Sequence, residues 1–411
     1  MRRVVITGIG AVSAMGVGVP ALWDGLAAGR SGVRRVTNCD VSRLNDPIAA
    51  EVPSFQPTAY VTEDELLLLD RFTVFALAAA AEAWKDAGLD LTDEERQRAG
   101  VLIGTALGGA GREDEAYADL YDKQRGAIRP HPFTVPRIMY NAASSHISMK
   151  YHLEGVALCV ATACSSASHA IGEAFEMIRA GRADVMIAGG ADAPIVTGII
   201  RAWEGMRILA RAGSDPSAAC RPFSADRQGI VLGEGAGIVV LEERERAMRR
   251  GAVVHAELVG YGATADGRHI TVPGVDMPAR AIRMALAQAG LAPEEIAYVN
   301  AHGTATRLND PTETAAIKQA FGAHARKLAV SSTKSMHGHA MGASGAIELL
   351  AALMAIERGV VPPTANYHEP DPECDLDYVP NQSRELTVDA AISSSLAFGG
   401  LNAVLAVRRA A

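Results

Sequence analysis

One cysteine, Cys164, stands where a nucleophile could work. It lies in Cys159-Val-Ala-Thr-Ala-Cys164-Ser-Ser-Ala-Ser-His169, where an apolar, strand-like run gives way to small residues. Residues 170–180 are predicted to form a helix, with Gly181 as its stop signal. A cysteine at the start of a helix lies near the positive end of the helix dipole, which favours the reactive thiolate. Taken alone, such a cysteine is more often a small buried hydrophobe, so its partners decide its role.

Three later segments contain imidazoles, an amine and tight turns, which are the partners that a nucleophile uses. They are residues 301–310 with His302, residues 334–339 with His337 and His339, and residues 393–402 with Phe398. Each has a plainer alternative. His302 could be a core or helix-capping histidine, the next two histidines could lie in an exposed glycine turn, and Phe398 could be core packing. Only together do these segments indicate a site.

Glu348 is harder to explain as an ordinary residue. It lies in a predicted helix whose other residues, from 346 to 356, are nearly all apolar, so its side chain is expected to face inward. A buried carboxylate needs a partner. Lys334 is the partner that we predict.

The composition argues against several classes of protein. The 411 residues carry a net charge of −8, so nucleic acid and anionic membranes are poor partners, and an acidic partner needs a local basic patch. Five cysteines form no CxxC pair, which argues against a disulfide framework or a structural zinc site and favours a reducing cytoplasm. We recognise neither a signal peptide nor an apolar run long enough to span a bilayer.

Apolar strand-like runs alternate with alanine-rich helical stretches along the whole chain, which is typical of an α/β fold. The predicted strands are residues 3–6, 101–104, 185–188, 237–241, 297–300, 328–332 and 403–407. A loop rich in turn formers is predicted over residues 362–373.

The chain also resembles itself. Trp84-Lys-Asp-Ala-Gly-Leu89 leads to a strand at 101–104, and Leu286-Ala-Gln-Ala-Gly-Leu291 leads to a strand at 297–300. A reactive cluster and an apolar helix follow in both cases. We therefore predict two duplicated αβ halves, residues 1–251 with Cys164 and residues 252–411 with the histidines and Lys334. Both clusters are expected at strand ends that face a shared crevice.

Several motifs in one order resemble the β-ketoacyl-acyl-carrier-protein synthases of the elongating, type II branch, which are condensing enzymes of the thiolase fold. The resemblance runs nearly end to end. Its segments are Val4-Val-Ile-Thr-Gly-Ile-Gly10, the Cys164 segment, Arg221-Pro-Phe-Ser-Ala-Asp-Arg227 with Gly233-Glu-Gly-Ala-Gly237, the His302 and Lys334 segments, and Phe398-Gly-Gly400. It implies a layered αβαβα body made of the two halves.

The resemblance also implies a reaction, a decarboxylative Claisen condensation of an acyl group with malonyl-acyl carrier protein that gives 3-oxoacyl-acyl carrier protein. Cys164 would carry the acyl group, and the backbone N–H groups of Cys164 and Phe398 would form the oxyanion hole. His302 and His339 match the two imidazoles that stabilise the enolate. The pathway would be fatty-acid or type II polyketide or polyene elongation.

Supporting roles follow from the same resemblance. Lys334 and Glu348 match a charged pair that tunes the histidines, and Asp310 is a further member of this network or of the substrate site. Thr304 and Thr306 match hydroxyls that bind the phosphopantetheine arm, and Leu107 matches a residue at the acyl pocket. Phe398 matches an aromatic gate. Because the arm arrives on the carrier protein, neither a free cofactor nor a metal is expected.

The expected partners are acyl carrier protein and a second, homologous subunit. The helix that often carries lysine and arginine in this family reads Glu63-Asp-Glu-Leu-Leu-Leu-Leu-Asp70 here. The remaining candidates for carrier docking are Lys123, Arg125, Arg129, Arg207 and Arg211, although charged runs are more often solvated faces. The second subunit could be identical, or the chain could be the active half of a heterodimer with a chain-length-factor-like protein.

Single residues weigh against the rival functions. A dinucleotide-binding fold lacks its third glycine, because position 13 is Ser13. A zinc hydrolase on His302, His337 and His339 has suitable ligand types but no accompanying water-activating motif. A thiolase would carry a second cysteine where Phe398 stands, and a starter-unit synthase would carry asparagine in place of His339. An inactive chain-length factor would lack Cys164.

Other departures from the family bear on whether the enzyme serves primary or specialised metabolism. His337 stands where threonine is usual, Arg307 where proline is usual, Ser394 where asparagine is usual, and Gln228 where an acid is usual. These departures fit a specialised synthase at least as well as one of primary metabolism.

Overall fold

The computed structural model describes residues 1–121 and 131–410. Ten strands follow one path through an 11-stranded sheet in the order β12-β11-β15-β16-β10-β1-β9-β7-β5-β6, and the short β2 pairs with β1. The ten strands are β1 (Val4–Ser13), β5 (Ala99–Gly104), β6 (Ala157–Val160), β7 (Val185–Asp192), β9 (Gly235–Glu243), β10 (Ala256–Ala265), β11 (Tyr298–Asn300), β12 (Ala329–Ser331), β15 (Ala390–Ala397) and β16 (Leu401–Arg408).

The sheet has an internal two-fold symmetry that reflects the predicted duplication. β1 and β10 meet at its centre as an antiparallel pair. Outward from β1, two antiparallel pairings with β9 and β7 are followed by two parallel pairings with β5 and β6. Outward from β10, the same pattern recurs with β16, β15, β11 and β12. We propose that the halves divide at residues 251 and 252, between α10 (Arg244–Arg249) and β10.

Glycines in the two central strands let one helix of each half lie directly on the sheet. A Cβ on Gly8 would lie 2.1 Å from a carbonyl oxygen of α3 (Arg71–Ala87). A Cβ on Gly260 would lie 2.1 Å from a carbonyl oxygen of α11 (Asp276–Ala289). Such distances exclude any larger residue. The close approach therefore occurs at equivalent places in the two halves.

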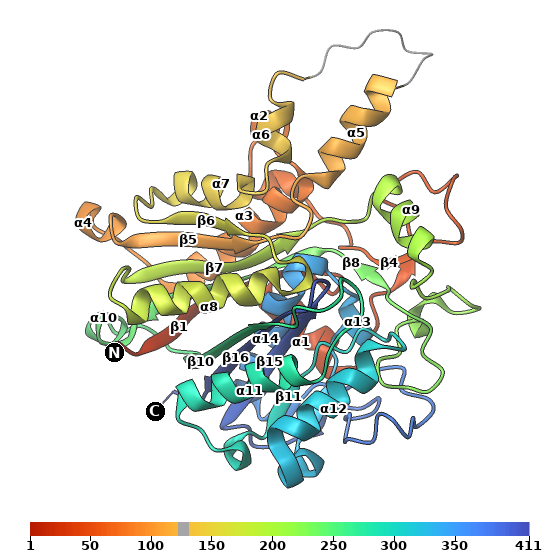
Figure 1. The fold of residues 1–411 in the computed structure, drawn as a ribbon. Coiled ribbons are helices and arrows are strands. Elements are labelled where there is room, and N and C mark those ends of the chain that lie inside the picture. Colours follow the sequence, from red (N-terminus) through yellow and green to blue (C-terminus); the bar gives the residue numbers. More distant parts are fainter. Residues whose placement is uncertain (122–130, 411) are drawn as a thin grey trace.

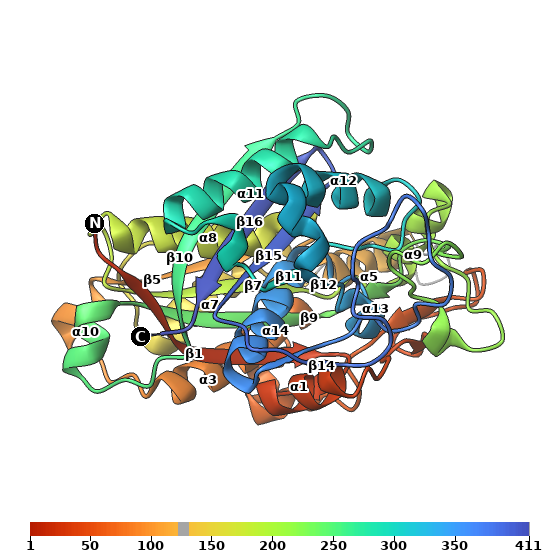
Figure 2. The same ribbon diagram turned by 90° about the horizontal axis from the view of Figure 1, so that it is seen from below.

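The helices and the two halves of the sheet form five layers (Figure 1). α3 and α7 (Ala142–Tyr151) cover the outer face of the N-terminal half, with a core of their own. α8 (Ser166–Arg179) and α14 (Ser344–Arg358) lie between the two half-sheets and share the largest core. α11 and α12 (Asn309–Phe321) cover the outer face of the C-terminal half, as Figure 2 shows from below. This is the layered αβαβα body that the sequence predicts.

Shorter elements link these layers. The remaining helices are α1 (Val19–Ala27), α2 (Glu63–Leu66), α4 (Asp93–Arg96), α5 (Ala110–Tyr121), α6 (Thr134–Ile138), α9 (Thr197–Met206) and α13 (Lys334–His337). The remaining strands are β2 (Gly16–Val17), β3 (Arg34–Arg35), β4 (Ile48–Ala50), β8 (Leu232–Gly233), β13 (Val360–Val361) and β14 (Arg384–Glu385). Within residues 1–121 and 131–410, no helix combines the length and the apolar character that crossing a membrane requires.

The predicted elements are largely found, with one notable difference beside Cys164. All seven predicted strands overlap observed strands, and residues 362–373 contain neither helix nor strand. The helix predicted for 170–180 begins four residues earlier, at Ser166. Small polar residues suggest a loop there, but their size lets the first turn pack against β5, where a Cβ on Gly104 would lie 2.3 Å from Ser166.

Candidate active site

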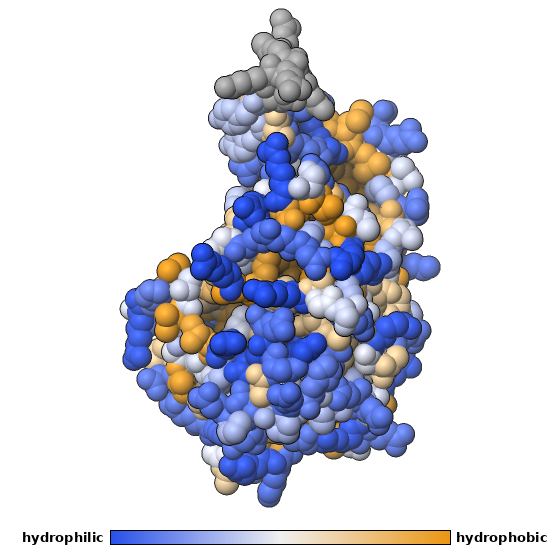
Figure 3. Space-filling view, turned by 90° about the vertical axis from the view of Figure 1, so that its right-hand side faces the viewer, coloured by the Kyte–Doolittle hydropathy of each residue, from blue (hydrophilic) through white to orange (hydrophobic). Residues whose placement is uncertain are grey.

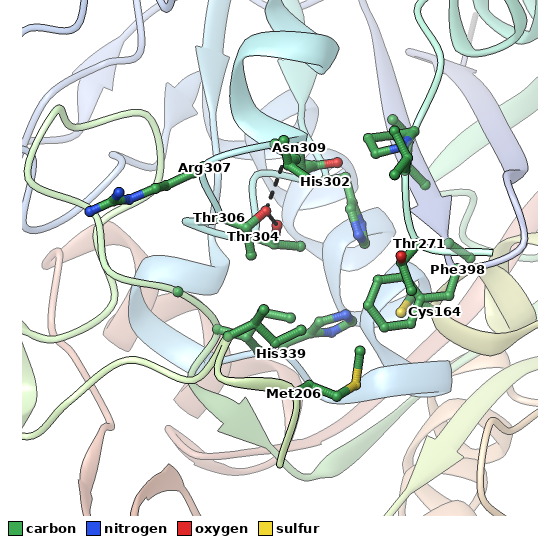
Figure 4. A pocket seen from close by; sticks show the side chains of 18 of the residues that line it. Cys164, Met206, Thr271, His302, Thr304, Thr306, Arg307, Asn309, His339 and Phe398 are labelled. Atoms are coloured by element: carbon green, nitrogen blue, oxygen red, sulfur yellow. Dashed lines mark hydrogen bonds between the residues drawn. The ribbon is translucent and has the colours of Figure 1, made fainter. Parts of the chain in front are cut away.

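The segments that the sequence singles out follow the carboxyl ends of parallel strands. Cys164 follows β6, His302 follows β11, Lys334 follows β12 and Phe398 follows β15. Such strand ends are where open α/β sheets place their ligands. The segments meet at a cavity of about 530 Å³ whose lining includes Cys164, His302, His339 and Phe398 (Figure 4).

Cys164 lies in a single 3-10 turn, η2 (Ala163–Ser165), directly before α8. The turn needs Ala163 in the left-handed region, with φ of 51°, which is an uncommon conformation for a residue with a Cβ. Ser166 closes the turn, since its Oγ donates to the Ala163 carbonyl at 2.7 Å and accepts from the Thr162 N–H at 2.9 Å. The thiol is thereby held at the start of the helix, as predicted.

The structure corrects the expectation that Cys164 is a thiolate. Burial raises the pKa of the Cys164 thiol to about 11, although Lys334 and the backbone N–H groups of Phe398 and Cys164 lower it. The residue is only 5% exposed. The free-energy cost of removing a thiolate from water therefore exceeds the stabilisation that the start of the helix provides. At neutral pH the resting residue is therefore a thiol. The same two N–H groups nevertheless surround the sulfur where an oxyanion would form.

His302 is held as a neutral ring with a known tautomer. Lys334 Nζ lies 3.2 Å from its Nδ1 and donates to its carbonyl oxygen at 2.6 Å. Because an ammonium only donates, Nδ1 is the acceptor and the proton of the neutral ring sits on Nε2. Burial, then the charge of Lys334, then His339 hold the pKa of His302 well below its usual 6.5.

His339 comes from the turn after α13 and faces His302. The two rings are perpendicular, with centroids 5.4 Å apart. Nδ1 of His339 lies 2.8 Å from Ser344 Oγ, and its buried Nε2 has no hydrogen-bond partner among the described residues. Burial and Lys334 hold the pKa of His339 well below 6.5. Both rings are therefore neutral and point toward the cavity (Figure 4).

Lys334 and Glu348 form the buried pair that the sequence predicts. Their side chains are 1% and 0% exposed, and Nζ of Lys334 donates to Oε1 of Glu348. With Nδ1 and the carbonyl oxygen of His302, this contact uses all three donors of the ammonium. Burial raises the pKa of Glu348, and the ammonium opposes this. Through the contacts of Lys334 with Nδ1 and the carbonyl oxygen, the pair fixes the orientation of the His302 ring.

The loop from 303 to 309 brings hydroxyl groups to the cavity. Thr304 and Thr306 both line it, with their Oγ1 atoms 3.0 Å apart. Thr306 Oγ1 also accepts from the Asn309 N–H at 3.2 Å (Figure 4). These hydroxyls therefore share one cavity with Cys164.

Asp310 is placed elsewhere than predicted. It is fully buried but neither lines the cavity nor contacts Lys334, because its carboxylate accepts from the Phe223 N–H at 2.7 Å and lies 3.9 Å from Arg227. Asp310 still holds this loop, since its carboxylate also accepts from the Thr304 N–H and the Asn309 side-chain amide. A second supporting carboxylate is Glu313, one helical turn later. It accepts from the N–H groups of His302 and Gly303 at 2.7 and 2.8 Å.

Sequence reasoning missed both Glu313 and Asp192. Asp192 closes the apolar strand β7, and its carboxylate accepts from Thr105 Oγ1 at 2.6 Å, the Ala106 N–H at 2.8 Å and the Gly342 N–H at 2.6 Å. Burial raises its pKa to about 6. Asp192 thus ties the end of β5 to the turn before α14. A charged residue at the end of an otherwise apolar strand was the available signal.

Phe398 and Leu107 lie in one apolar cluster with Cys164. The Phe398 ring stacks on Trp203 with centroids 5.9 Å apart, and the ring lies next to the sulfur (Figure 4). Gly399 and Gly400, with φ of 85° and 69°, form the turn that aims the Phe398 N–H at the thiol. Leu107 packs in this cluster but is not among the residues that line the cavity, so its predicted place at the acyl pocket stays a prediction.

The candidate docking residues separate into two sets. Lys123, Arg125 and Arg129 lie outside the described residues. Arg207 and Arg211 are exposed, and Arg207 lines the cavity at its mouth.

The zinc site proposed as an alternative is not assembled. His337 is 1% exposed and its Nε2 lies 3.0 Å from Thr333 Oγ1, so it does not join the other two histidines. The donor atoms that do converge belong to Cys164, His302 and His339, all within 4.8 Å of one another. A thiol between two neutral imidazoles also suits covalent catalysis on an acyl group.

Two parts of the chain each match a protein-family model. Residues 1–247 match the model described as beta-ketoacyl synthase, N-terminal domain, and residues 255–368 match the one described as beta-ketoacyl synthase, C-terminal domain. The chain belongs to the β-ketoacyl synthase family. The family predicted from the motifs is therefore confirmed.

Curated relatives of the family cover the chain almost entirely. It is 46% identical over 410 residues to nodulation protein E of Rhizobium sp. (strain N33), covering 99% of both chains. It is 45% identical over 410 residues to 3-oxoacyl-[acyl-carrier-protein] synthase 2 of Synechocystis sp., covering 99% of this chain and 98% of that protein. The chain is thus a 3-oxoacyl-[acyl-carrier-protein] synthase type of acyltransferase.

Solved ketosynthases share the whole fold. A structure described as the ishigamide ketosynthase/chain length factor superposes with a TM-score of 0.93 at 39% identity, covering 100% of both chains. Another, described as a type II PKS acyl-carrier protein in complex with its ketosynthase bound to the hexaketide, gives 0.90 at 36% identity with the same coverage. The predicted thiolase-like α/β fold is confirmed.

Proposed function

We propose that the protein joins an acyl group held on Cys164 to a malonyl unit carried by acyl carrier protein, with loss of carbon dioxide. The observation that carries this proposal is the convergence of one buried thiol and two neutral imidazoles within 4.8 Å, with the backbone N–H groups of Cys164 and Phe398 beside the same sulfur. Family membership and the full-length relatives support the same reaction.

In the first step, the Cys164 sulfur attacks the acyl thioester of the carrier. The attacking form is the thiolate, so the Cys164 proton must leave as the thioester enters. The C–S bond to the pantetheine sulfur then breaks, and that sulfur takes up one proton, which balances the proton that Cys164 lost. The N–H groups of Cys164 and Phe398 stabilise the tetrahedral oxyanion.

In the second step, malonyl-carrier loses carbon dioxide and the electron pair of the broken bond forms an enolate. Nε2–H of His302 donates to the enolate oxygen, and we propose that Ser344 donates to Nδ1 of His339 so that His339 also presents a proton on Nε2. The enolate carbon attacks the acyl thioester on Cys164. The Cys164 thiolate leaves and takes up one proton, which regenerates the enzyme and releases 3-oxoacyl-carrier.

Thr304 and Thr306 are assigned to the phosphopantetheine arm, since both line the same cavity as Cys164. No dissociable cofactor and no metal takes part in these steps. All five cysteines are free, which fits our assignment of the protein to the cytoplasm.

A test of the nucleophile is direct. Wild-type protein incubated with an acyl-carrier thioester should gain the mass of one acyl group, and Cys164→Ala should gain none while still folding. Acyl transfer to the Cys164→Ala variant, read by intact mass, would refute the assignment. Products formed from malonyl-carrier and a series of acyl-carriers would then identify the preferred chain.

A second possibility is that the chain is the active subunit of a heterodimer with a chain-length-factor-like partner. It is favoured by the likeness to a ketosynthase/chain length factor structure. β6 also forms an edge of the sheet on which Leu158 is 47% exposed, and an open edge with an apolar side chain favours pairing with another chain. Native mass of the protein alone and with a co-expressed homologue would separate a homodimer from a heterodimer.

A further inference from the structure

The proposed oxyanion hole is built from two segments that follow strands of different halves of the sheet. One N–H group belongs to Cys164 in η2, after β6, and the other belongs to Phe398, after β15. The turn at Gly399 and Gly400 comes directly after Phe398 and leads into β16. Because both donors must point at one oxyanion, the distance between η2 and this turn has to be fixed.

Ser165 connects the two segments. Its Oγ lies 2.9 Å from the Thr162 carbonyl oxygen and 3.1 Å from the Leu401 carbonyl oxygen, so its single hydroxyl proton serves both acceptors. The first contact is a local turn that serine often forms with its own backbone. The second joins the residue after Cys164 to the first residue of β16, three positions after Phe398. Local capping does not explain this second contact.

His169 supports the same connection one helical turn later. Its Nδ1 lies 2.9 Å from Thr162 Oγ1, and its ring meets the Tyr261 ring edge-on, with centroids 6.3 Å apart. Burial lowers the pKa of His169, and hydrogen bonds with the backbone of Ser165 and Asn402 oppose this shift. The neutral ring therefore contacts the turn before the nucleophile and the start of β16 at the same time.

We propose that Ser165, supported by His169, is a positioning residue that holds the N–H groups of Cys164 and Phe398 at the spacing that the oxyanion requires. This inference rests on the proposed function. Without the Ser165 hydroxyl, the Leu401 carbonyl loses its tie to η2, and the Phe398 N–H shifts relative to the sulfur.

The two steps of the proposed reaction depend on this spacing to different extents. Acyl loading forms a tetrahedral oxyanion in the hole. Decarboxylation of malonyl-carrier by the unloaded enzyme instead places its negative charge at His302 and His339. A defect in the spacing should therefore slow loading and spare decarboxylation.

Ser165 acts without contacting the cavity. Its side chain is 0% exposed, and it is not among the residues that line the catalytic cavity. The lining includes Trp203 and Met206 of α9. This helix projects on the side of the molecule that Figure 3 shows, where hydrophobic residues lie in a hollow between hydrophilic ones. A change at Ser165 leaves this surface intact, so it should alter the rate of loading and not the binding of the carrier.

The test compares Ser165→Ala and His169→Phe with a matched control, Ser168→Ala. Ser168 is equally buried on the same helix, and its Oγ lies 2.8 Å from Ser395 Oγ of β15. The control thus removes a buried hydrogen bond between the same two halves without touching η2 or the glycine turn. Acyl loading from acyl-carrier is followed by intact mass, carbon dioxide release is measured with malonyl-carrier alone, and thermal unfolding is recorded for each protein.

Ser165→Ala should lower the maximal loading rate roughly tenfold or more, since a misplacement of about 1 Å can cost about 100-fold in rate. The half-saturating carrier concentration and the decarboxylation rate should stay at wild-type values. His169→Phe should change loading in the same direction but less. Ser168→Ala should melt like Ser165→Ala, because each loses one buried hydrogen bond, and should load at the wild-type rate.

A loading rate in either Ser165→Ala or His169→Phe that matches the control would overturn the inference. Equal losses of loading and decarboxylation would overturn it as well, because they would indicate general disorder of the site. If the wild type gains no acyl group, the proposed function itself fails.

Discussion

Replacing Glu348 by glutamine tests whether the buried ion pair holds the active site together. The change keeps the shape of the side chain but leaves the Lys334 ammonium, which is 1% exposed, without its counter-charge. Breaking a buried pair by removing one partner typically costs about 3–5 kcal/mol. With about 2.1 cal/mol/K of unfolding entropy per residue, 411 residues give about 0.9 kcal/mol/K. The melting temperature should therefore fall by roughly 3–6 °C.

The assay is thermal unfolding of Glu348→Gln beside two other variants. Glu357→Gln makes the same change on the same helix at an exposed carboxylate that lies 3.9 Å from His255, and it should move stability by less than about 0.5 kcal/mol. The double variant Lys334→Met/Glu348→Leu removes both charges and should recover most of the loss. If Glu348→Gln melts no lower than Glu357→Gln, the pair does not stabilise the fold and our account of Lys334 is wrong.

Three further predictions concern the chemistry. His339→Ala should slow malonyl decarboxylation about 100- to 1000-fold and acyl loading much less, whereas equal losses in both assays would indicate a structural role. Because the pKa values of His302 and His339 are depressed, both rings stay neutral as the pH falls, and decarboxylation should show no acidic limb near pH 6.5. Alkylation of Cys164 by iodoacetamide should accelerate about tenfold per pH unit up to about pH 10, since its thiol has a pKa of about 11; a plateau below about pH 9 would contradict the raised pKa.

Much of the fold could be predicted from local patterns. Apolar runs located the strands, and the internal repeat indicated two halves because equivalent helices follow equivalent strands. The first turn of α8 was missed, since Ser166 and Ser168 are residues that are also typical of loops. Helix formation from Ser166 onward depends on the space beside Gly104, which is a property of the packed structure. Local sequence does not contain that information.

Site residues could be predicted from sequence where the chemistry permits only one type of partner. They were missed where the choice depends on distances in the folded structure. Lys334 and Glu348 could be paired because an inward-facing carboxylate requires a cation. Asp310 was named and Glu313, one helical turn later, was missed, because sequence does not show which carboxylate faces the His302 backbone. The thiolate expected at Cys164 was wrong for a similar reason, since a helix start is visible in sequence and burial is not.

The duplication also explains why only one half carries a nucleophile. η2 precedes α8, and η6 (Met341–Ala343) precedes α14 in the same way, with Ala163 and Met341 both in the left-handed region at φ of 51° and 48°. The residue that corresponds to Cys164 is therefore Gly342.

A side chain cannot stand at Gly342. A Cβ there would lie 2.5 Å from the Ala106 nitrogen and 2.6 Å from Oδ2 of Asp192, which accepts the Gly342 N–H. Because Asp192 occupies this space to join the two halves, the second turn serves as a brace, and the first keeps room for an acyl thioester. We therefore expect Gly342→Ala to lower acyl loading by displacing Asp192, and Gly290→Ala, at a glycine in the left-handed region with no atom within 4 Å of an added Cβ, to leave it unchanged. Normal loading of the Gly342→Ala variant, measured by intact mass, would show that the brace is dispensable.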